Sequence, residues 1–249
     1  MRPVRMQIAV RRRLRWPLPL CARRCNGQAC RGELDPRGDH RAACCLSGRL
    51  KRRSLPIERV WARVFRESGA RVIPNDFLRD TSLPAIASHD GRRIEVLTTG
   101  LPLYRGVPLA VDATLVSALH ADGQPWAGAA ERDGVAIQRG ERAKRTTYPE
   151  LVGSSVVRLV TLACEAGGRW SDECRSVLRD LAAFRARSAP PMLQRAARSA
   201  WLLRWSALLS VAQQDALAAT LVDDVPVELD GTDGEPPTEV GVWLDGQAR

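Results

Sequence analysis

The residues with the most distinctive chemistry are cysteines and a histidine that crowd into residues 25–45. This stretch holds four of the chain's seven cysteines and one of its three histidines, among turn residues and charges rather than apolar residues. Zinc prefers four tetrahedral sulfur and nitrogen ligands, and its binding free energy can substitute for a missing hydrophobic core. The spacing C-x4-C-x9-H-x3-C therefore predicts one zinc ion bound by Cys25, Cys30, His40 and Cys44.

Two further cysteines flank this set, and Cys21 or Cys45 can replace a neighbouring ligand. The alternative interpretation is a flexible leader with free thiols. Residues 1–20 lack the sustained apolar run of a secretory signal, so we expect a protein that is not secreted and a reducing compartment, nucleus or cytoplasm, where disulfides are rare. Cys164 and Cys174 are isolated in the sequence, and we expect both to be buried as small apolar residues.

A second candidate group is acidic. Asp112 lies in the apolar run PLAVDATLV, where burial of a carboxylate is costly unless the group is paired or binds a metal. Glu95 lies in the preceding extended run, and Lys144 follows the next loop. Two carboxylates can hold Mg²⁺ against a scissile phosphate while a lysine orients or deprotonates the attacking water. The same spacing also fits an ordinary acid pair in a β-hairpin.

The elements that must position these residues follow from hydrophobic periodicity. Residues 54–70 place apolar side chains at helical spacing, with Ser54 as the N-cap and Gly69 as the stop. Residues 92–97 and 108–116 predict two strands, residues 140–151 a short helix, and the β-branched run 155–164 a central buried strand. Two helices are expected over 171–187 and 190–221. This order predicts an α/β core, a sheet with helices on its faces.

Charge is distributed unevenly along the 249 residues. Residues 1–71 contain 19 Lys and Arg against 5 Asp and Glu, a local balance of +14 in a chain with net charge +10. We therefore expect residues 1–20 to be a basic arm, 21–48 a CCHC zinc knuckle, 51–220 the main domain and 221–249 an acidic disordered tail. A basic front is typical of proteins that bind polyphosphates, although an arginine-rich solvated surface is the simpler alternative. The sequence has no apolar run long enough to cross a membrane.

Five segments in this order resemble the C-terminal region of site-specific non-LTR retrotransposon polyproteins. The segments are GDHRAAC, GRLKRRSLPIERVWARVFRESGA, IEVLTTGLPLYRGVPLAVDATLVS, KRTTYPELV and EAGGRWSDE. The resemblance covers roughly residues 20–220. It implies a zinc knuckle followed by a restriction-like endonuclease of the PD-(D/E)xK type, a mixed sheet flanked by helices, which nicks target DNA with Mg²⁺ to prime reverse transcription.

Residue by residue, the resemblance implies an acidic pair at Glu95 and Asp112, a catalytic lysine at Lys144 and a tyrosine at Tyr148. It also implies an auxiliary acid at Glu58. The chain departs from the family pattern in three places: Ile94 replaces a proline, Glu95 stands where aspartate is frequent, and Thr147 replaces a second lysine. No polymerase motif is visible in the sequence, since the adjacent aspartates Asp223 and Asp224 lie in the acidic tail.

Three functions are therefore open at the level of the sequence. The first is a Mg²⁺-dependent DNA endonuclease that binds DNA, or RNA, through its basic N-terminal region, with a reverse transcriptase acting in trans. The second is a catalytically inactive nucleic-acid-binding remnant, in which the acidic pair and the lysine are structural. The third is a protein-interaction module whose basic front binds acidic partners.

Overall fold

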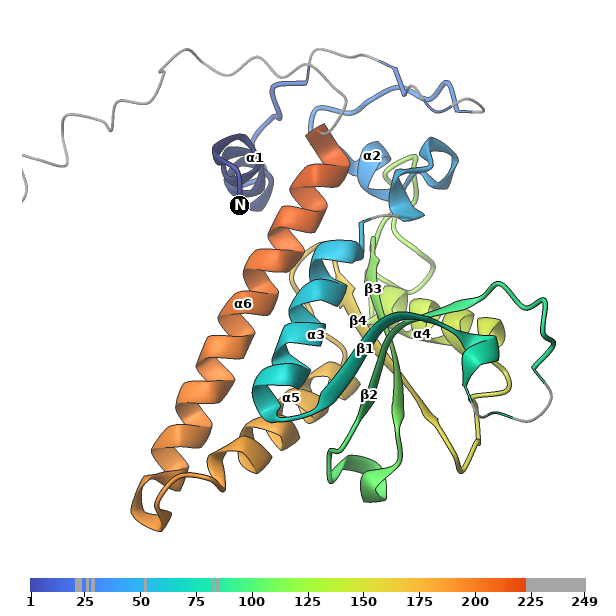
Figure 1. Cartoon of the computed structure of the whole chain (residues 1–249). Coiled ribbons are helices and arrows are strands. Elements are labelled where there is room, and N and C mark those ends of the chain that lie inside the picture. The colour runs from blue at the N-terminus through green and yellow to red at the C-terminus, as the bar shows by residue number, and fades with distance from the viewer. Residues whose placement is uncertain are drawn as a thin grey trace, which may run out of the picture.

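The computed structural model describes residues 1–20, 24–25, 27, 30–51, 53–81, 83 and 86–222. Over these residues it has a mixed α/β architecture, shown in Figure 1. The α-helices and strands are α1 (Pro3–Arg13), α2 (Asp39–Ala43), α3 (Leu55–Ser68), β1 (Arg71–Phe77), β2 (Arg93–Thr99), β3 (Leu109–Val116), α4 (Val135–Thr147), β4 (Arg158–Glu165), α5 (Asp172–Ala186) and α6 (Gln194–Val222). Within the described part of the chain, no helix is long and apolar enough to cross a membrane.

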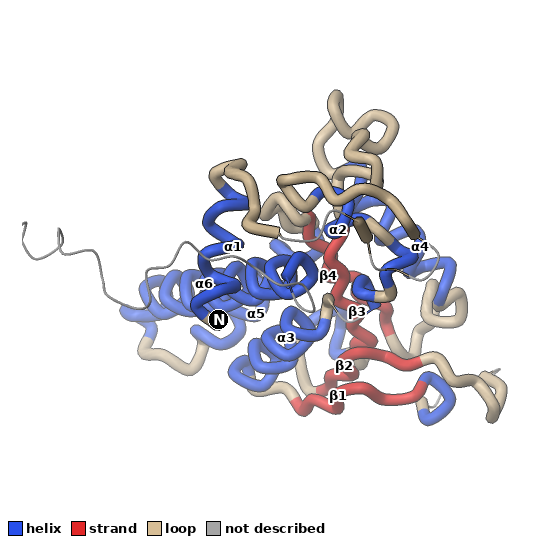
Figure 2. The backbone as a smooth tube through the Cα atoms, turned by 90° about the horizontal axis from the view of Figure 1, so that it is seen from above, coloured by secondary structure: helices blue, strands red, loops and turns tan. Residues whose placement is uncertain are grey.

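The four strands form one sheet in the order β1-β2-β3-β4. The first three strands are antiparallel neighbours, whereas β3 and β4 are parallel and are connected through α4. Figure 2 shows α4 on one side of the sheet and α1, α3, α5 and α6 on the other. The expected sheet with helices on its faces is confirmed.

Helix α3 forms where the sequence predicts it, because its apolar side chains recur on one face. Ile57, Trp61 and Phe65 are fully buried against the sheet and α6. Gly69 ends the helix with φ of 101°, a left-handed conformation that costs a residue without a β-carbon little. Ser54 precedes the helix, but its side chain makes no capping hydrogen bond with the backbone.

Strand β4 differs in one respect from the prediction. Its middle residues are buried, as the β-branched run indicates, but the strand lies at one end of the hydrogen-bonded order instead of in the centre. Burial comes from the helices: α4 and α5 both pack against β4. The long apolar run therefore indicated that both faces of the strand are covered by helices, but it did not indicate the strand's position in the sheet.

At the two chain ends, the sequence predicted a basic arm and an acidic tail. Within residues 1–20, the predicted basic arm, Pro3–Arg13 form α1, which buries Ile8 and Ala9 against the core. Arg5 contacts Asp215 of α6 at 3.0 Å, so part of the basic charge is internally paired. Helix α6 continues to Val222 with its last residues buried, and residues 223–249 of the predicted tail lie outside the described residues.

Candidate metal centre and acidic site

The four predicted metal ligands lie together. One ligand atom from each of Cys25, Cys30, His40 and Cys44 can be chosen so that all four lie within 4.8 Å of one another. The Cys25 and Cys44 sulfurs are 3.9 Å apart, and Cys30 Sγ is 3.4 Å from His40 Nε2. Tetrahedral zinc with bonds of about 2.3 Å to sulfur places its ligand atoms about 3.8 Å apart. The arrangement can hold one metal ion.

Two different local structures supply these ligands. Cys25 and Cys30 lie near the antiparallel bridge between Arg24 and Glu33, where the Cys25 N–H donates to Gly32 O and the Cys30 N–H donates to Gly27 O. His40 lies in α2 and Cys44 at its C-cap, one helical turn apart. The second half of the site is therefore a helix. The x3 spacing is the helical signal, because residues four apart share a face.

Hydrogen bonds hold the short helix in place. The Asp35 carboxylate accepts the N–H groups of Arg37, Asp39 and His40, and these bonds with the nearby Arg12 lower the pKa of Asp35 although its burial opposes the charge. Asp39 pairs with Arg12 of α1. These contacts fix the backbone that presents His40 to the cysteines.

The other three cysteines of the described residues lie outside this four-residue cluster. Cys45 is exposed and is not one of the four clustered residues, and Cys21 lies outside the described residues. Cys164 and Cys174 are buried in the main core, as predicted from their isolation in the sequence.

The acidic residues also converge. The β2–β3 pairing ends at Val96 and Val111, and the same register continued by one residue sets Glu95 opposite Asp112. Beyond that point β2 provides no backbone partner for β3, and the Ala113 N–H instead donates to Glu95 Oε2 at 2.5 Å. The Glu95 side chain therefore lies beside Asp112, on the strand that carries it.

Lys144 of α4 completes the acidic site. Its ammonium donates to Asp112 Oδ2 at 2.8 Å and lies 4.0 Å from Glu95 Oε1. Burial disfavours the charge on Lys144, but Asp112 and then Glu95 outweigh that cost, so the pKa of Lys144 is raised. The other oxygen of Asp112, Oδ1, is buried and has no hydrogen-bond partner among the described residues.

Three negative charges cannot coexist here without compensation. Burial, then Asp112 and then Glu58, raise the pKa of Glu95 to about 9. Burial also raises the pKa of Asp112, against the effect of Lys144. Glu58, on the first turn of α3, has a raised pKa because of burial and the nearby Asp112, although it accepts a hydrogen bond from Ser54. The cluster has an excess of carboxylates over cations.

Tyr148 has a different place from the other predicted residues. Its hydroxyl donates to the backbone oxygen of Arg93 at 2.7 Å, and among the described residues no hydrogen bond joins it to Glu95 or Asp112. Arg92 adds a second connection between the end of α4 and the start of β2, since its guanidinium pairs with both Asp90 and Glu150 at 2.6 Å. Together they fasten the end of α4 to the start of β2, the strand that carries Glu95. No sequence pattern pointed to Arg92.

The pKa of Glu95 leads to a prediction about stability. An acid whose pKa is raised from 4.5 to about 9 on folding makes its full contribution to stability below pH 4.5, and this contribution is lost progressively as the pH rises from 4.5 to about 9. Glutamine resembles the protonated acid at every pH. We therefore expect Glu95→Gln to unfold at a temperature roughly 3–10 °C higher than wild type at pH 8 without Mg²⁺, and at a similar temperature at pH 5.

Glu67→Gln provides a control of opposite sign in the same thermal-unfolding measurement. Hydrogen bonding from Arg204, with further bonds from Arg63 and Trp205, lowers the pKa of Glu67 to about 2. Its charged form therefore stabilises the fold at both pH values, and the glutamine variant should unfold at a lower temperature at each. A lower unfolding temperature for Glu95→Gln at pH 8 would contradict the raised pKa.

Comparison with known proteins adds no family to this geometry. No protein-family model matches the chain, and no curated protein matches it either.

Proposed function

We propose that the chain is a retroelement-derived nucleic-acid-binding protein with a zinc knuckle and a Mg²⁺-dependent DNA endonuclease domain of the PD-(D/E)xK type. The endonuclease would nick target DNA, which places its action in the nucleus, with a reverse transcriptase acting in trans. The order α3-β1-β2-β3-α4-β4 around a mixed sheet supports a restriction-like core. The Cys₃His cluster has the donor set that zinc prefers.

One observation carries the proposal: the buried Asp112 Oδ1 has no hydrogen-bond partner in the described part of the chain, beside a second carboxylate and a lysine. An unpartnered buried carboxylate oxygen costs about 1–3 kcal/mol or more, so such an atom calls for an explanation. A hard cation with oxygen ligands provides one. Asp112 and Glu95 are the residues that would hold Mg²⁺, with Glu58 as the auxiliary acid.

The residues divide the chemistry of phosphodiester hydrolysis between them. Bound Mg²⁺ would act as a Lewis acid on the phosphate and lower the pKa of a bound water. Lys144 would orient the attacking water and neutralise charge on the phosphate as the bond breaks. Tyr148 would act as a positioning residue, because its hydroxyl holds the end of α4 against β2.

The catalytically inactive remnant is the second candidate, and a specific contact favours it. Lys144 already forms an ion pair with Asp112 at 2.8 Å, with a side chain that is only 27% exposed. Such a buried pair can persist as a structural element after catalysis is lost. In that case the chain would bind DNA or RNA and leave it intact.

Nicking of a supercoiled plasmid separates the two candidates. Asp112→Asn keeps the size of the side chain but removes the charge that Mg²⁺ binding requires, so we expect at least about a thousandfold loss of Mg²⁺-dependent nicking. Affinity for DNA should be unchanged, with the same steep decrease of log K with log salt, since phosphate contacts come from basic residues.

Asp133→Asn is the matched control, because Asp133 is exposed and pairs with Arg169 at the surface. It should nick at the wild-type rate. Equal trace cleavage by wild type and Asp112→Asn would indicate a contaminating nuclease, and the inactive remnant would then be the better description.

A further inference from the structure

We propose that His40 is a positioning residue that attaches the hairpin between β3 and α4 to the metal cluster, so that metal loading orders this hairpin. The hairpin, residues 117–126, connects the strand that bears Asp112 to the helix that bears Lys144. The inference rests on the proposed function only for its effect on nicking. Its structural part stands on contacts of the cluster itself.

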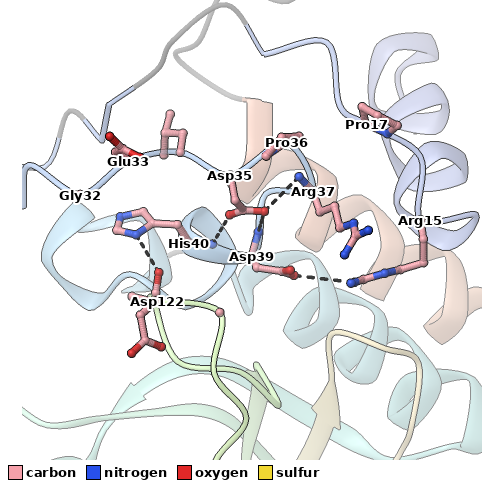
Figure 3. Close-up of a pocket in the computed structure, with 13 residues that line it drawn as sticks. Arg15, Pro17, Gly32, Glu33, Asp35, Pro36, Arg37, Asp39, His40 and Asp122 are labelled. Atoms are coloured by element: carbon pink, nitrogen blue, oxygen red, sulfur yellow. Dashed lines mark hydrogen bonds and ion pairs between the residues drawn. The ribbon is translucent and has the colours of Figure 1, made fainter.

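The two ring nitrogens of His40 face different partners. Nε2 lies 3.4 Å from Cys30 Sγ, on the side of the cluster, and Nδ1 lies 2.8 Å from the backbone oxygen of Ala121. When Nε2 binds a metal, the ring proton must be on Nδ1, which then donates to Ala121 O. Figure 3 shows the ring directed from α2 toward the hairpin. Metal binding thus fixes the tautomer that makes this bond.

The ring orientation depends on a glycine. Gly32 faces the imidazole (Figure 3). A β-carbon at this position would lie 2.5 Å from His40 Cε1 and 3.1 Å from Nδ1. A cavity of about 1070 Å³ is lined by Arg15, His40 and Ala121, among others. The hydrogen bond between His40 and Ala121 joins two walls of this cavity.

Beyond Ala121, the hairpin is internally connected as far as α4. The His120 N–H donates to Gln124 O at 2.7 Å, and the Trp126 N–H donates to Ala118 O at 3.1 Å. The Trp126 ring then packs against α4, with the Arg139 guanidinium 3.9 Å from its centroid. A continuous series of contacts therefore leads from the metal cluster to the helix that carries Lys144.

The test uses the full chain loaded with zinc and the variant His40→Cys. Four cysteines form a normal structural zinc site, so zinc should be retained, but the donor to Ala121 is lost. Hydrogen exchange should remain slow in residues 30–44 and become roughly threefold to tenfold faster at His120, Gly123 and Trp126, as loss of one hydrogen bond predicts. Under the proposed function, nicking should slow several-fold while DNA affinity is unchanged.

Removal of zinc from the wild-type chain by a chelator is the second arm, which remains decisive if His40→Cys fails to bind zinc. Removal of zinc should accelerate hydrogen exchange in residues 30–44 and in the hairpin of residues 117–126 together. His89→Cys is the matched control, since His89 is exposed, and it should resemble wild type. Unchanged exchange of the hairpin after chelation, or in zinc-loaded His40→Cys, would overturn the inference. Absence of nicking in every sample would count against the proposed function and leave the exchange result valid.

Discussion

Replacing Lys144 with methionine is expected to slow Mg²⁺-dependent nicking by roughly two to four orders of magnitude. Methionine keeps the length of the side chain and removes its charge. The ammonium that lies 2.8 Å from Asp112 and 4.0 Å from Glu95 is then missing when charge develops on the phosphate. The affinity for divalent cations should instead stay the same or increase, because a positive charge that competes for the carboxylates has been removed.

This pairing of effects distinguishes a catalytic lysine from a structural one. Mg²⁺ binding, followed by titration calorimetry, should be as tight as in wild type or tighter in Lys144→Met, and weaker in Asp112→Asn. Arg145→Met is the matched control, since Arg145 is the next residue on α4 and is exposed. If Lys144→Met nicks at the wild-type rate, or if it loses Mg²⁺ binding together with activity, the catalytic role assigned to the lysine is wrong.

Much of the fold was predictable because local patterns report burial. Helix α3 has an apolar stripe long enough to determine its place, and Gly69 marks its end. The pattern was silent where burial depends on distant partners. Helix α1 carries four arginines among its eleven residues, and the burial of Ile8 and Ala9 depends on contacts with distant elements such as α6. β4 was expected in the centre of the sheet because a run of buried residues looks the same wherever helices cover both faces.

The candidate sites likewise combine features that a local sequence pattern predicts with features that depend on distant residues. The x3 spacing between His40 and Cys44 is local, and it places both residues on one helical face. The meeting of Glu95 and Asp112 depends on the register of two strands, and a slip of one residue would have separated them. The bond between His40 and Ala121 joins residues 81 positions apart, for which the sequence has no signal. The functional roles of these acids stay predictions until nicking is measured.

The largest expected change in structure follows from loss of one metal ligand. Purified wild-type protein should contain about one zinc per chain, and Cys30→Ser should contain almost none, because a serine hydroxyl is a poor ligand for zinc at neutral pH. Zinc contributes roughly 10–16 kcal/mol to the folding of small zinc-finger peptides, far more than the few buried apolar side chains near this cluster can replace.

We therefore expect the segment around Cys25 and the helix α2 to lose their protection from hydrogen exchange in Cys30→Ser, while the sheet and α3–α6 remain folded. The main core has its own buried cluster, which is dominated by side chains from α3, β3, β4, α5 and α6 and does not depend on the metal ligands. Cys45→Ser is the matched control, since Cys45 adjoins Cys44 but is exposed and outside the cluster. It should keep zinc and protection. Full zinc content in Cys30→Ser would remove Cys30 from the site, and loss of zinc in Cys45→Ser would make Cys45 a ligand instead.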